Sequence, residues 1–124
     1  AHRTPNETLK LAEEAKDNGI RVFIAGAGGA AHLAGVIASS TPLSVIGVPM
    51  QTSALGGLDS LLSIVQMPGG IPVATTAIGK AAAKNAAILA AQMIGLADPA
   101  MMKKVEDFKK AQAEKVLANS YLDM

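Results

Sequence analysis

RVFIAGAGGAAHL, residues 21–33, joins an apolar run to a glycine-rich turn that ends in a histidine. Val22, Phe23 and Ile24 suit a buried strand. The glycines allow positive φ and close approach of the backbone, and the alanines after them can open a helix. Backbone N–H groups at such a turn, next to the positive end of a helix, favour anions or polar ring substituents. The stretch therefore predicts a strand, a ligand-binding loop and a helix start.

Strands and helices alternate on both sides of this stretch. Residues 43–48 and 72–78 are predicted to be further strands. The runs at 21–28 and 43–49 are continuously apolar, which predicts parallel strands buried on both faces. Caps, prolines and apolar spacing predict helices around them, over residues 5–18, 32–39, 58–65, 79–94 and 99–118. This alternation predicts an α/β fold.

Composition restricts the class of protein. The chain has 124 residues, of which 50% are hydrophobic, and a net charge of +1, which fits one folded domain. Balanced charge and an aromatic content of 2% give no basis for nucleic-acid binding. No run of about 18 consecutive apolar residues predicts a membrane span. The lack of cysteine excludes disulfides and thiolate metal sites, and it is compatible with a reducing cytosol.

The glycine turn also fits the loose dinucleotide pattern G-x-G-x-x-A at residues 26–31. That fingerprint requires an acidic residue about 20 positions further on, at the end of the next strand, to hold a ribose hydroxyl. Residues 46–50, IGVPM, contain no acidic side chain. We therefore do not expect NAD to bind this turn.

The chain has two histidines, His2 and His32, and both lie at predicted turns. A single histidine at a helix start is more often structural than catalytic. However, His2 is followed by Arg3, a fixed cation suited to phosphate or carboxylate, and His32 ends the glycine turn. In an open α/β sheet ligands gather where strands end and helices begin, so both histidines could face one crevice.

Four motifs in order resemble the PurE family of purine biosynthesis: AHRTP at 1–5, GAGGAAHL at 26–33, ALGGLDSL at 54–61 and SIVQMPGGIPVATTAIGKA at 63–81. The resemblance covers essentially the whole chain. It implies a three-layer, flavodoxin-like parallel sheet and a cytoplasmic homo-octamer. It also implies an isomerase, the class I mutase that converts N(5)-carboxyaminoimidazole ribonucleotide into 4-carboxy-5-aminoimidazole ribonucleotide. The GAGGAAHL form resembles class I rather than the AIR carboxylases of class II.

The resemblance also assigns roles to individual residues. Moving a carboxylate from an exocyclic nitrogen to a ring carbon requires loss and recapture of CO2 and transfer of one proton, and an imidazole suits the proton step. By similarity His2 is the general acid/base and Arg3 binds the nucleotide. The ring and CO2 would lie against the glycine turn and the helix start: Ala27, Gly28, Gly29, Ala30, His32 and Leu33. Neither a metal nor an organic cofactor is implied.

The sequence departs from the family pattern in two places. Family members carry a strand and a Gly-Ser-x-Ser-Asp turn before AHRTP, whereas this sequence opens on AHRTP itself. Ala34 also replaces the proline that usually follows HL. We expect residues 1–124 to form a single PurE-type domain that lacks the first strand-helix-strand unit, with 99–118 as a peripheral helix. Two other functions stay open: carboxylation of aminoimidazole ribonucleotide by free CO2, and a non-catalytic nucleotide-binding or assembly role.

Overall fold

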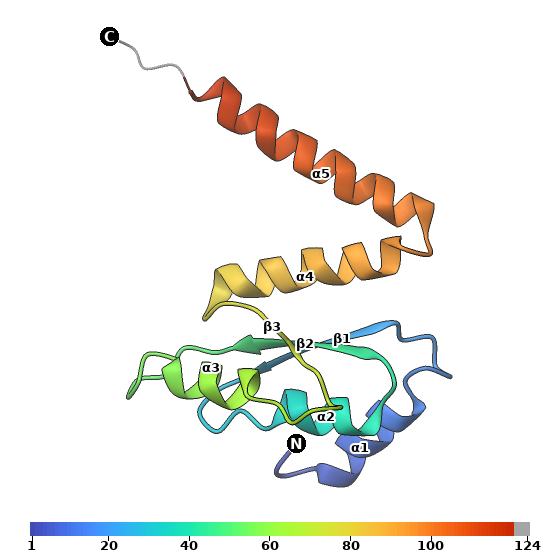
Figure 1. The fold of residues 1–124 in the computed structure, drawn as a ribbon, viewed down its shortest axis with the longest axis vertical. Helices are drawn as coiled ribbons and strands as arrows, with labels where there is room; N and C mark the ends of the chain where they lie inside the picture. Colours follow the sequence, from blue (N-terminus) through green and yellow to red (C-terminus); the bar gives the residue numbers. More distant parts are fainter. Residues whose placement is uncertain (121–124) are drawn as a thin grey trace. The chain divides into compact units, whose positions relative to one another are not determined.

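The computed structural model describes residues 1–120, which form two compact units, one of residues 1–90 and one that begins at Ala91 (Figure 1). The first unit contains a sheet of three parallel strands in the order β1-β2-β3. These strands are β1 (Val22–Ala27), β2 (Ser44–Pro49) and β3 (Ala74–Thr75). Parallel strands joined through helices confirm the predicted α/β class and fit the flavodoxin-like architecture.

Three helices lie on one side of this sheet: α1 (Pro5–Glu14), α2 (Leu33–Ser40) and α3 (Leu58–Val65) (Figure 1). The strand register pairs Phe23 with Val45, and both side chains are buried. The core cluster adds small residues from α1, the turn after it, β1 and α2, together with one larger residue: Ala12, Ala15, Ala25, Ala34 and Ile37. Because most of these side chains are short, α1 and α2 approach the sheet closely.

Gly47, in the middle of β2, allows α2 and α3 to pack against the sheet. A Cβ atom at this position would lie 2.5 Å from Ile64 Cγ2, 3.0 Å from Val73 Cγ1 and 3.5 Å from Ala34 Cβ. Ile64 is only 1% exposed, so it has little room to move. The hydrogen of Gly47 therefore sets how closely α3 approaches β2.

Two strand predictions differ from the structure. Burial alternates along β1, where Phe23 is buried and Ile24 is 46% exposed, so this chain by itself buries only one of the two faces predicted to be buried. Phe23 and Ala25 lie on the face of β1 that packs in the core cluster with α1 and α2, and Ile24 lies on the opposite face, whereas β2 is buried from Val45 to Pro49. The third strand is shorter than the predicted 72–78 at both ends, and at its start Pro72 has no N–H to give to a ladder.

Helices α4 (Lys80–Gly95) and α5 (Pro99–Ala118) follow the sheet in the chain. In the first unit, Ala82 and Ala86 of α4 are one helical turn apart and buried. At the start of α5, Asp98 accepts a hydrogen bond from the Met101 N–H at 3.1 Å, which caps the helix. No helix among residues 1–120 combines the length and the apolar character needed to cross a membrane.

Candidate active site

The loops that follow β1 and β2 meet at the carboxyl end of the sheet. The N–H of Met50, directly after β2, donates to the C=O of Ala27, the last residue of β1, at 2.9 Å. From Ala27 the chain passes through the glycine turn and enters α2 at Leu33. In parallel α/β sheets this edge is where ligands bind, so the predicted loop lies where the fold favours a site.

The glycine turn has an unusual backbone. Gly29 has φ +65° and Ala31 has φ +44°, a left-handed conformation that costs a non-glycine residue about 1–2 kcal/mol. Hydrogen bonds hold the turn: the Ala31 N–H donates to Gly28 C=O at 3.1 Å, and the Gly29 N–H donates to Ser60 Oγ at 3.0 Å. Two backbone N–H groups that the sequence predicted to be available to a ligand are therefore hydrogen-bonded within the protein.

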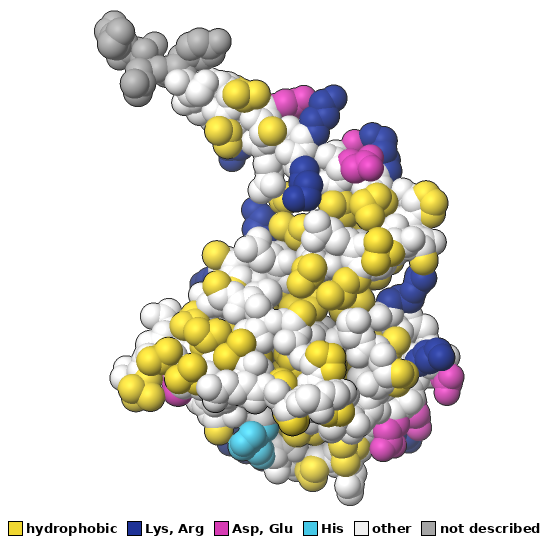
Figure 2. Space-filling view, viewed as in Figure 1, with side chains coloured by type: hydrophobic (Ala, Val, Ile, Leu, Met, Phe, Trp, Pro, Cys, Tyr) yellow, Lys and Arg dark blue, Asp and Glu magenta, His cyan; other side chains and the backbone are white. Residues whose placement is uncertain are grey.

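The structure brings the two histidines together. His32 Nδ1 lies 2.8 Å from His2 Nε2, and the rings meet edge to face with centroids 4.8 Å apart. Both side chains are exposed and lie together on the surface (Figure 2). A hydrogen bond between two imidazoles needs one N–H and one bare ring nitrogen, so one of these rings donates and the other accepts. The arrangement suits acid/base chemistry.

Two small hollows flank His32. One, of about 200 Å³, lies between the two histidines and the first turns of α1. The other, of about 280 Å³, lies beside Ala31, Ser63 and Met67. Apolar walls with a few polar groups are typical of sites for small molecules. Both hollows are therefore within reach of the imidazoles.

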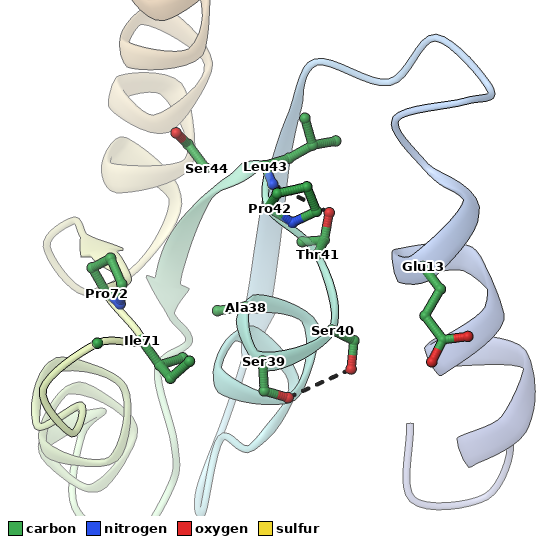
Figure 3. Close-up of a pocket in the computed structure, with 11 residues that line it drawn as sticks. Glu13, Ala38, Ser39, Ser40, Thr41, Pro42, Leu43, Ser44, Ile71 and Pro72 are labelled. Carbon is green, nitrogen blue, oxygen red and sulfur yellow. Dashed lines mark hydrogen bonds between the residues drawn. The ribbon is translucent and has the colours of Figure 1, made fainter.

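A larger hollow, of about 670 Å³, lies at the opposite end of the strands, beside the start of β2 (Figure 3). It is formed by the end of α2, the start of β2 and the segment before β3, with Glu13 of α1 on one side. Serine and threonine hydroxyls and one carboxylate line it, but no imidazole does. The volume of a hollow is therefore not sufficient to identify the active site. The two histidines favour the site at the carboxyl end of the strands.

The remaining predicted residues occupy different positions around the turn. Arg3 is exposed and makes no ion pair within residues 1–120, and Ala30 is exposed at the tip of the turn. Leu33 is half-buried and packs against the core cluster. In this part of the chain no three histidine or acidic side chains gather as a metal site would require. The geometry thus unites His2, His32 and the turn, while the individual roles stay predictions.

Sequence reasoning missed Ser60. Its side chain is fully buried, and its Oγ accepts the Gly29 N–H and donates to the Met50 C=O at 2.8 Å. The available signal was a polar residue on the buried face of α3, four positions before the buried Ile64. A buried hydroxyl is normally hydrogen-bonded, so such a residue indicates an internal contact, although its partners cannot be read from the pattern.

Comparison with known proteins gives strong matches. The family model for AIR carboxylase matches residues 1–115. The N5-carboxyaminoimidazole ribonucleotide mutase of Escherichia coli (strain K12) is 57% identical over 119 residues, which cover 96% of this chain and 70% of the relative. The mutase of Bacillus subtilis (strain 168) is 56% identical over 97% of this chain and 74% of its own length. The mutase of Vibrio parahaemolyticus is 60% identical over 96% of this chain and 74% of its own length.

Proposed function

Because this chain belongs to the AIR carboxylase family, we propose that it is an N5-carboxyaminoimidazole ribonucleotide mutase of purine biosynthesis. Relatives more than 55% identical to it carry this name, which favours the mutase over the carboxylase and over a non-catalytic role. The structural observation that carries the proposal is the contact of 2.8 Å between His2 and His32 beside the glycine turn. It provides an acid/base group where the fold favours a ligand.

In the proposed reaction the bond between the exocyclic nitrogen and the carboxylate breaks and releases CO2. The neighbouring ring carbon then bonds to CO2 and loses its proton, while the nitrogen gains one, so that one proton moves overall. His2 is the proposed carrier of this proton, since an imidazole can both donate and accept near neutral pH. The bond to His32 would fix the orientation of the His2 ring.

The other binding roles are also proposals. Arg3 would bind the nucleotide phosphate, because its guanidinium is exposed, lies next to His2 and has no partner within residues 1–120. The turn from Ala27 to Ala30, together with His32 and Leu33, would form the wall against which the ring and CO2 lie. The reaction needs no metal or organic cofactor, because loss and recapture of CO2 requires only enclosure and proton transfer.

A substrate comparison tests the proposed reaction. Supplied with N5-carboxyaminoimidazole ribonucleotide and no bicarbonate, the protein should form 4-carboxy-5-aminoimidazole ribonucleotide, measured by chromatography. Aminoimidazole ribonucleotide with bicarbonate should react at least about tenfold more slowly, because CO2 must then enter from solution. A preference for the second pair would favour the carboxylase, and binding without either reaction would favour the non-catalytic role.

We also propose that the protein is a cytoplasmic homo-oligomer, and an octamer as the resemblance implies. Apolar side chains repeat along an exposed face of α3: Leu58 is 50% exposed, Leu62 46% and Val65 49%. Hydrophobic side chains gather in this region of the surface (Figure 2). Large exposed apolar patches mark interaction sites, so this face of α3 is a suitable subunit contact.

Light scattering should therefore give a mass eight times that of the 12.6 kDa chain. Leu62→Lys should lower this mass, because it places a charge in the apolar face of α3. Lys16→Ala, which alters an exposed residue after α1, should leave the mass unchanged. A mass of one chain for the unaltered protein at micromolar concentration would contradict the assembly.

A further inference from the structure

We infer that Ser60 is a positioning residue, whose buried hydroxyl fixes the glycine turn and thereby places His32 against His2. The catalytic consequence rests on the proposed mutase function, whereas the positioning itself rests on hydrogen bonds within the first unit. Ser60 makes its hydrogen bond to the proposed substrate wall at the Gly29 N–H, so we infer that it acts through the turn.

The Ser60 hydroxyl joins two loops. Its single proton goes to the C=O of Met50 at 2.8 Å, and its oxygen accepts the N–H of Gly29 at 3.0 Å. The side chain is 0% exposed, so bulk water does not reach it to replace either bond. One buried oxygen therefore ties the loop after β1 to the loop after β2.

The bond to Ser60 also fixes the orientation of the peptide groups between Gly28 and His32. In a trans peptide the C=O of Gly28 points opposite to the N–H of Gly29, and residues 1–120 contain no cis peptide bond. Since the Gly29 N–H points to Ser60, the Gly28 C=O points away from it and accepts the N–H of Ala31 at 3.1 Å. This bond helps to hold Ala31 at φ +44°, directly before His32.

Ser63, one helical turn further along α3, does not duplicate this role. Its hydroxyl donates to the C=O of Asp59 in the same helix at 2.7 Å, while its distance to the C=O of Gly29 is 3.4 Å. The bond to Gly29 is the longer and weaker of the two, and because Ser63 is exposed, water competes for it. Ser60, by contrast, uses its proton and a lone pair on two different loops.

The experiment is Ser60→Ala in the whole chain, with two readouts. The long-range ¹H–¹⁵N spectrum should show shifted imidazole signals, and it contains only two imidazoles because the chain has only two histidines. The mutase kcat should fall about tenfold or more, as expected for loss of a buried hydrogen bond that orients reacting groups. The KM should change less, because the phosphate is assigned to Arg3. Ser44→Ala, at the exposed start of β2, is the matched control and should change neither readout.

A folded Ser60→Ala protein with the parent's imidazole signals and a kcat within about twofold would overturn the inference. If this variant does not fold, hydrogen exchange of the Gly29 amide in the unaltered protein tests whether the bond to Ser60 is present. Slow exchange supports the bond to Ser60, and exchange as fast as that of an exposed amide contradicts it. Both spectroscopic measurements work on a protein without mutase turnover, so failure of the proposed function would be recognised separately.

Discussion

Replacing His2 with asparagine should lower the mutase kcat by about a thousandfold, while the Kd for the nucleotide stays within about threefold. The asparagine amide can still form a hydrogen bond with His32, but it cannot take up and release a proton near neutral pH. The nucleotide keeps its proposed phosphate partner, Arg3. Steady-state kinetics and a binding titration measure the two quantities separately.

His32→Gln is the companion variant for this prediction. It leaves the imidazole of His2 in place and removes only the ring that contacts it at 2.8 Å. We expect a smaller loss of kcat than for His2→Asn, because His2 is exposed and can still exchange protons through water. If His2→Asn kept more than about a tenth of the parent kcat, the acid/base role of His2 would be wrong.

Gly47→Ala should lower the free energy of unfolding by about 3 kcal/mol, at the upper end of the usual cost of overpacking. The added methyl group would lie 2.5 Å from Ile64 Cγ2 and 3.0 Å from Val73 Cγ1. Ile64 is almost fully buried and cannot turn away, so α3 would have to move from the sheet. Urea denaturation of both proteins measures the difference.

Gly69→Ala provides the matched glycine control, because a Cβ there meets nothing within 4 Å and its φ is not left-handed. It should change the free energy of unfolding by less than about 0.5 kcal/mol. Adding Ile64→Ala to Gly47→Ala removes the atom that clashes, so the double variant should lose less than the sum of the single losses. Equal urea midpoints for Gly47→Ala and Gly69→Ala would refute the predicted clash.

The sequence predicted those elements whose signals are local. The apolar run and glycines of residues 21–33 place β1, the turn and α2, and α3 spans the predicted 58–65. Helix α1 begins at Pro5 as predicted, since proline suits a first helical position, but it ends at Glu14 rather than at 18. The end differs because a hydrogen-bonded turn from Ala15 to Gly19 follows, a choice that depends on packing rather than on propensity.

The site was less accessible to sequence reasoning because its contacts join distant segments. The pattern placed His2 and His32 at helix starts, but only the fold brings their ring nitrogens to 2.8 Å across 30 residues. Ser60 gave no signal of its partners, since these lie in two loops whose meeting depends on strand register. The N–H groups of the turn were predicted to be free for the same reason.

Helix α3 is held on one face at two points four residues apart: Ile64 packs at Gly47, and Ser60 bonds to the loops at the carboxyl edge. A substitution beneath this helix that moves it from the sheet, such as Gly47→Ala, should therefore also displace the hydroxyl that orients the turn. Substitutions under α3 should therefore change the melting temperature and the turnover rate together. Selection for one of these properties alone would then be limited by its effect on the other.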